Sequence, residues 1–149
     1  MADAVLAVDV GGTKLAVGRV DAGGRLSDRV AAPTPGRGAA EAMWDVLAGL
    51  VAEVRRGDEA ACGVGSGGPM TPGGEAVSPL NIPAWRGFPL QARLAEATGR
   101  PVFVDNDAKA LALAEGWRGA ARGQRDYLAM VVSTGVGGGV VVDGRLLDG

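Results

Sequence analysis

The chain has 149 residues, 47% of them hydrophobic, and a formal net charge of -2. This length accommodates one domain, or one domain and part of a second. The near-neutral charge and the absence of any basic run disfavour nucleic-acid and membrane-surface partners. Histidine is absent and Cys62 is the only cysteine, which excludes an internal disulfide, histidine-dependent nucleophiles and the usual zinc sites.

Possible targeting segments and the glycine content restrict the class of protein further. No apolar stretch approaches the roughly 20 residues that a membrane span needs. Met1 leads almost directly into a strand-like segment without a charged leader, so a cytoplasmic protein is expected. The 26 glycines gather in short groups. Such groups are typical of tight turns with exposed backbone amides.

The first half of the chain predicts an antiparallel meander followed by a helix. Residues 4–10, 15–20 and 26–31 are strand-like and are separated by glycine turns. Apolar side chains then recur at helical spacing over 39–56. The predicted buried face of this helix consists of Met43, Leu47, Leu50, Val51 and Val54.

The second half alternates strands and helices. We predict a strand over 61–64, a helix over 90–98 that Gly99 ends, a strand over 102–104, and a helix over 108–117. Strand-like segments at 127–132 and 140–142 then begin a new sheet. Two or three strands bury too little surface to be stable alone. We therefore predict one lobe over residues 1–118 and an incomplete second lobe over 119–149.

Two similar glycine turns carry the first chemical signal. Residues 9–14 read DVGGTK, in which Asp9 nearly ends a buried strand and a glycine turn reverses the chain. Converging backbone amides at such a turn suit a phosphate, and a carboxylate beside it suits a hydrated Mg²⁺. The alternative is an ordinary hairpin. Residues 133–139 read STGVGGG and repeat the arrangement. The pair predicts a nucleotide held between two lobes.

A third motif, VDNDA over residues 104–108, joins a strand to a helix. Ligand-binding groups gather at such strand ends in open α/β sheets. Asp107 is a candidate base for accepting a hydroxyl proton, with Asn106 bonding neighbouring hydroxyls. The alternative is that Asp107 only caps the helix. We expect Asp105 to cap or orient the turn.

Residues 63–68 match the dinucleotide pattern G-x-G-x-x-G, but Pro69 and Pro72 block the helix that this pattern requires. The glycine run over 65–74 is therefore expected to be a loop on the sugar side. No P-loop pattern is present either.

These motifs, in this order and spacing, resemble the ROK family (repressor, open reading frame, kinase) of the actin-like ATPase superfamily. Gly67-Gly68-Pro69 and the run PLNIPAW over 79–85 extend the likeness to essentially the whole chain. The resemblance implies an α/β fold, namely a ribonuclease-H-like lobe of the actin and hexokinase type with a mixed sheet flanked by helices, plus the start of a second similar lobe.

The resemblance also implies the activity, which is ATP-dependent phosphorylation of a hexose hydroxyl by a glucokinase-like enzyme, here as its N-terminal portion. It implies ATP and Mg²⁺ as cofactors, a hexose or N-acetylhexosamine as substrate, and a homo-oligomer in the intact protein. The implied site consists of Asp107 as general base; Gly68, Asn81, Asn106 and Asp107 at the sugar; Gly11, Gly12, Thr13, Lys14, Thr134 and Gly135 at the phosphates; and Asp9 at Mg²⁺ through water.

Several alternatives stay open. Family members continue into a Glu-x-x-His sugar motif and an adenine-binding region, and many have a cysteine-rich zinc site; none of these is found within the 149 residues. The chain is alternatively a catalytically inactive sugar-binding or interaction module, or the sugar-sensing part of a repressor. The kinase branch is favoured because no helix-turn-helix precedes the first strand. Polyphosphate is an alternative donor.

Overall fold

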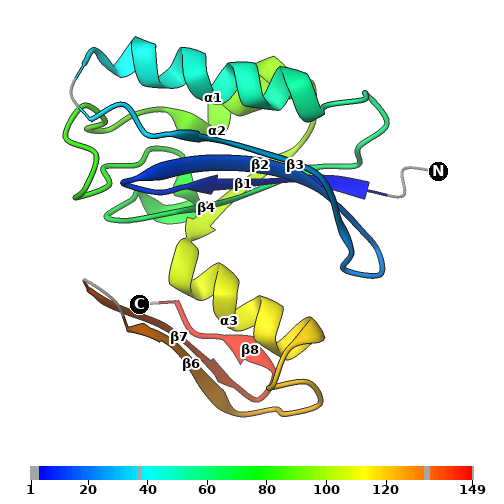
Figure 1. Cartoon of the computed structure of the whole chain (residues 1–149). Helices are drawn as coiled ribbons and strands as arrows, with labels where there is room; N and C mark the ends of the chain where they lie inside the picture. Colours follow the sequence, from blue (N-terminus) through cyan, green and yellow to red (C-terminus); the bar gives the residue numbers. More distant parts are fainter. Residues whose placement is uncertain (1–3, 37, 133–134, 149) are drawn as a thin grey trace. The chain divides into compact units, whose positions relative to one another are not determined.

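The computed structural model describes residues 4–36, 38–132 and 135–148, and the chain divides into two compact units, Met1–Asp105 and Asn106–Gly149. The elements along the chain are β1 (Ala4–Val10), β2 (Lys14–Asp21), β3 (Leu26–Pro33), α1 (Ala40–Val54), β4 (Cys62–Ser66), the short 3₁₀ helix η1 (Pro72–Gly74), α2 (Leu90–Thr98), β5 (Val102–Asn106), α3 (Asp107–Arg118), β6 (Tyr127–Val132), β7 (Val136–Val142) and β8 (Arg145–Leu146) (Figure 1). None of the helices within the described ranges is long and apolar enough to cross a membrane.

The first unit is built on a five-stranded mixed sheet in the order β3-β2-β1-β4-β5. β1, β2 and β3 form the predicted antiparallel meander, and β1 runs parallel to β4. Val10 is paired with Ser66 at the carboxyl ends of the two parallel strands. The turn after β1 and the loop after β4 therefore leave the sheet at the same edge.

The core of the first unit lies between this sheet and the helices α1 and α2, which cover one of its faces (Figure 1). Side chains alternate along β1, so that Leu6, Val8 and Val10 are buried while Asp9 is exposed on the opposite face. The predicted helical face is confirmed. The buried residues of α1 are Met43, Trp44, Leu47, Leu50, Val51 and Val54.

Two strands extend beyond the predicted ends. β4 continues to Ser66 and β5 to Asn106, each two residues past the predicted limit. Gly65 and Ser66 have weak strand preference, but they pair with Asp9 and Val10 of β1. Pairing with a neighbouring strand decides the conformation of such residues, and a local pattern does not contain that information.

The second unit packs α3 against one face of an antiparallel sheet, β6-β7-β8. The approach is close, because a Cβ atom placed on Gly139 would lie 2.6 Å from the Cβ of Ala112. The Tyr127 hydroxyl also donates to the Ala112 carbonyl at 2.9 Å. Residues 106–118 therefore group with the second unit, whereas the sequence placed them with the first.

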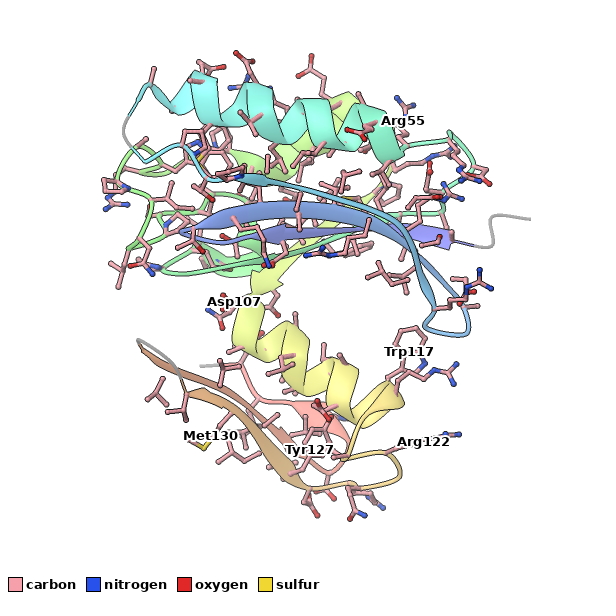
Figure 2. The ribbon with its side chains drawn as sticks, viewed as in Figure 1. Arg55, Asp107, Trp117, Arg122, Tyr127 and Met130 are labelled. Atoms are coloured by element: carbon pink, nitrogen blue, oxygen red, sulfur yellow. The ribbon has the colours of Figure 1, made fainter. Side chains whose placement is uncertain are left out.

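The other face of this second sheet is apolar and exposed. Antiparallel register pairs Leu128 with Val140 and Val132 with Val136, on the face opposite to Tyr127 and Gly139. Met130 points away from α3 in Figure 2 and is 54% exposed. Contiguous apolar patches of this kind mark interaction surfaces. We define the apolar face of the second unit as Leu128, Met130, Val132, Val136, Val140 and Val142.

Cys62 behaves as a core residue of β4. Its side chain is fully buried, and burial raises the pKa of the thiol from its ordinary value of 9.0 to about 12. We expect the native chain to leave this thiol unlabelled by Ellman's reagent at pH 8, because only the thiolate attacks the reagent. Denaturation should release one reactive thiol per chain. Rapid labelling of the native protein would contradict the packing of β4.

Candidate functional site

The turn after β1 is held closed by its own backbone and by one threonine. The Gly11 N–H donates to the Lys14 carbonyl at 3.0 Å, so this amide is engaged within the turn. The Thr34 hydroxyl donates to the Gly11 carbonyl at 2.7 Å, and the Thr34 N–H donates to the Thr13 carbonyl at 3.0 Å. Gly12, Thr13 and Lys14 are exposed. These three residues are therefore the positions at which the turn can meet a phosphate.

Sequence reasoning did not identify Thr34. Its position follows from the meander, since Pro33 at the end of β3 is paired with Lys14 at the start of β2. The residue after β3 must therefore lie beside the turn after β1. The predicted meander was therefore a signal from which Thr34 could have been placed beside this turn.

Three predicted site residues come together in the first unit. A Cβ atom on Gly12 would lie only 2.6 Å from the Cβ of Asn81, so the glycine turn lies directly against the loop that carries Asn81. Leu80, next to Asn81, donates its N–H to the Gly68 carbonyl at 3.2 Å. Position 12 is glycine because Asn81 occupies the space where a side chain would be.

Gly12→Ala should therefore displace the Asn81 loop. A methyl group at 2.6 Å from Asn81 cannot be accommodated without movement. We expect a loss of about 1–3 kcal/mol in unfolding free energy, the usual cost of overpacking. Chemical denaturation measures this loss, and amide chemical shifts report movement at Asn81. Gly63→Ala is the matched control, because a Cβ atom on Gly63 meets nothing within 4 Å. Equal effects from both variants would contradict the steric explanation.

The glycine-proline loop has the form expected from its prolines. No helix begins at Gly68 or Pro69, and between β4 and α2, where every residue is described, the only helical segment is η1, at Pro72–Gly74. The Gly68–Pro69 peptide is cis. No helix N-terminus for a pyrophosphate therefore follows the G-x-G-x-x-G pattern, and the expectation that the prolines block this helix is confirmed.

The start of α3 corrects one interpretation. The N-cap of α3 is Asn106, whose Oδ1 accepts from the Ala108 N–H at 3.0 Å. Asp107 is the first helical residue and is exposed (Figure 2). The N-cap position is thus Asn106, whereas the sequence suggested Asp105 or Asp107, but Asp107 Oδ1 also accepts from the Ala108 N–H, at 2.8 Å. An asparagine side chain is short enough to reach the helix amide from the preceding position, so it takes this role.

The surroundings of Asp9 fit a hydrated cation. Its strand neighbours are Ala16 on β2 and Gly65 on β4, which leave space around an exposed carboxylate. Among the described residues no group of three or more His, Cys, Asp or Glu side chains is placed to hold a metal ion. A single carboxylate is nonetheless enough for Mg²⁺, which retains waters and takes its remaining ligands from phosphate.

The predicted residues are divided between the two units. Asp9, residues 11–14, Gly68 and Asn81 belong to the first, and Asn106, Asp107 and Gly135 to the second. Gly135 lies exposed in the loop between β6 and β7, and Thr134 lies outside the described residues. Because in-line phosphoryl transfer brings phosphate and hydroxyl together, we predict that Asp9, Gly12 and Asp107 open on one sheet edge.

The solved structures to which this chain is similar include sugar kinases. The chain superimposes with a TM-score of 0.87 and 36% identity on a glucokinase from Streptomyces griseus in complex with glucose and AMPPNP, covering 98% of this chain and 46% of that one. The model of the ROK family matches residues 5–149, and the chain belongs to this family. The predicted fold class is thereby confirmed.

Curated relatives agree. The glucokinase of Thermotoga maritima is 40% identical over 148 residues, which cover 97% of this chain and 46% of the relative. The N-acetylmannosamine kinase of Citrobacter koseri is 41% identical over 145 residues, which cover 97% of this chain and 49% of the relative. The chain thus spans about half the length of the relatives it matches.

Proposed function

We propose that this chain is the N-terminal part of an ATP-dependent sugar kinase that phosphorylates a hydroxyl of a hexose or N-acetylhexosamine. The observation that carries the proposal is the contact between Gly12 and Asn81. It puts an exposed phosphate-type turn beside a loop that the family resemblance assigns to the sugar. Phosphoryl transfer requires this proximity, because donor and acceptor must be held in line.

The remaining roles follow from the chemistry of each group. Asp107 accepts the proton of the attacking hydroxyl, for which its exposed carboxylate is suited. Gly68, Asn81 and Asn106 bind the sugar. The phosphates are bound by Gly12, Thr13, Lys14, Thr134 and Gly135, and Gly11 closes the first of these turns through its N–H. Asp9 would hold a hydrated Mg²⁺, which would supply positive charge against the phosphates.

The second unit is proposed as the start of a second lobe, which continues in the half of the relatives that this chain does not match. The apolar face of the second unit supports this, since Leu128, Val132 and Val136 are each more than half exposed. Covering such a face with further structure is favourable by about 25 cal/mol per Å² of buried apolar surface. Assembly into a homo-oligomer in the intact protein is proposed on the resemblance alone.

A coupled assay of ADP release tests the proposed function. The purified chain is supplied with Mg²⁺-ATP and either glucose or N-acetylmannosamine, and polyphosphate replaces ATP in a parallel series with sugar phosphate as the product measured. Sugar-dependent ADP release supports the kinase. Calorimetric binding of the sugar without ADP release indicates a sugar-binding module instead. A chain that neither binds the sugar nor releases ADP would overturn the proposal for this chain.

A further inference from the structure

One guanidinium group, that of Arg86, bridges three carbonyls of the loop that carries Asn81. Residues 79–86 contain no helix or strand, and the turn bonds within them run from the Ile82 N–H to the Pro79 carbonyl and from the Trp85 N–H to the Ile82 carbonyl, each at 3.0 Å. Arg86 Nη1 donates to the carbonyls of Pro79 at 2.9 Å, Ile82 at 3.2 Å and Trp85 at 3.0 Å. Two of these carbonyls bracket Asn81 along the chain. The two hydrogens of Nη1 are shared among the three acceptors.

The base of the same loop is anchored independently of Arg86. The Trp85 indole N–H donates to the Ala40 carbonyl at 3.1 Å, and its ring stacks on Phe88 with 4.1 Å between centroids. Gly87 donates its N–H to the Ser78 hydroxyl at 2.8 Å. Loss of Arg86 would therefore leave the tip of the loop, which carries Asn81, with only the backbone bonds of Leu80 and Ile82, and would loosen it without detaching its base.

We propose that Arg86 is a positioning residue that holds Asn81 against Gly12 and so sets the affinity for the sugar. The inference rests on the proposed function for the sugar-binding role of Asn81. Arg86 acts through the carbonyls of Pro79 and Ile82 and does not itself touch the sugar. Its effect should therefore appear in sugar binding and not in proton transfer.

The test compares three variants. Arg86→Met removes the donors while keeping an unbranched apolar stem. Arg86→Lys restores them, because an ammonium group has three hydrogens for three carbonyls. Arg55→Met is the matched control, since Arg55 Nη1 donates to one backbone carbonyl, that of Ala97 in α2, at 3.2 Å. Arg55 lies at the end of α1 in Figure 2.

We expect Arg86→Met to raise the Kd for glucose or N-acetylmannosamine about ten-fold, the effect of losing one well-placed hydrogen bond to the ligand. In the active protein the sugar KM should rise equally, with kcat and the KM for ATP unchanged. Arg86→Lys should recover most of the affinity, and Arg55→Met should leave it unchanged. A merely structural role predicts no split between sugar KM and kcat and no rescue by lysine.

Amide hydrogen exchange makes the test independent of turnover. The N–H groups of Leu80 and Ile82 donate within the loop, so their exchange should accelerate in Arg86→Met and stay at the wild-type rate in Arg55→Met. Unchanged exchange in Arg86→Met would overturn the positioning role. Accelerated exchange in Arg86→Met, together with a wild-type chain that binds neither sugar, would uphold the holding of the loop by Arg86 and reject the proposed function instead.

Discussion

Asp107→Asn is expected to lower the rate of phosphoryl transfer by about 10²–10⁴-fold, the usual contribution of a general base. The amide has the size of the carboxylate but cannot accept the hydroxyl proton. Sugar and ATP affinities should change little, since most hydrogen bonds at the position are retained. ADP release gives kcat, and calorimetry gives the two dissociation constants.

The structure sharpens this experiment, because Asn106 Oδ1 accepts the same Ala108 N–H as Asp107 Oδ1, and the Asp107→Asn side chain keeps its δ oxygen. Asn106 caps the helix, so Asp107→Asn should cost less than about 1 kcal/mol of unfolding free energy, the limit set by the helix dipole at an exposed position. Asp45→Asn is the control, as Asp45 is an exposed carboxylate on α1. Near-normal turnover in Asp107→Asn would leave the proposed kinase without its base.

Local patterns were enough to predict most of the fold. The meander is encoded by short apolar runs with glycine turns between them, and α1 by apolar residues at helical spacing, so neither requires knowledge of distant neighbours. The position of Thr34 beside the turn after β1 could also be derived from the predicted meander, because Pro33 pairs with Lys14. The end of α2 at Gly99 was predicted for the same reason, since Gly99 adopts the left-handed conformation (φ 65°) that favours glycine.

What could not be predicted depends on residues far apart in the sequence. The approach of Gly12 to Asn81 joins positions almost 70 residues apart, and no local pattern contains that distance. In the sequence, Arg86 looks like an ordinary surface charge, because its hydrogen bonds to the loop carbonyls exist only in the folded chain. The grouping of α3 with the second sheet depends on the small residues at Ala112 and Gly139, which permit close packing.

The buried pair of Arg19 and Glu59 also could not be predicted from local patterns. Its loss is the second prediction with a large expected effect. Arg19 lies within β2 and is 7% exposed, and Glu59 is fully buried, although the two are 40 residues apart. The guanidinium donates to the Glu59 carboxylate and also pairs with Asp58 at 2.9 Å. Oε1 and Oε2 of Glu59 accept the N–H groups of Arg56 and Gly57 at 2.8 and 3.0 Å.

Glu59→Gln should therefore lower the free energy of unfolding by about 3 kcal/mol, because the buried Arg19 loses its buried carboxylate partner and keeps the more exposed Asp58. The amide of glutamine also presents N–H donors toward backbone groups that are themselves donors. Urea denaturation followed by Trp fluorescence measures the loss. Glu53→Gln, at an exposed position on α1, should stay within about 0.5 kcal/mol of wild type.

The pH dependence of the unfolding free energy distinguishes the effect of the Glu59 charge from that of the shape of its side chain. Burial acts to raise the pKa of Glu59, but the N–H groups of Arg56, Glu59 and Gly57 and the charge of Arg19 outweigh it, and the pKa lies below its ordinary value of 4.5. For an acid with a lowered pKa, the stabilisation is complete above pH 4.5 and is lost as the pH falls through the folded-state pKa. The stability difference between wild type and Glu59→Gln should therefore be constant near neutral pH and shrink in acid.

A double variant completes the argument. Arg19→Met removes the buried cation, so Arg19→Met combined with Glu59→Gln should be less destabilised than the sum of the two single variants. The coupling should persist in high salt, because Arg19 and Glu59 are shielded from mobile ions. Additive losses, or a Glu59→Gln difference that does not change below pH 4.5, would show that Glu59 stabilises the fold through packing and not through its charge.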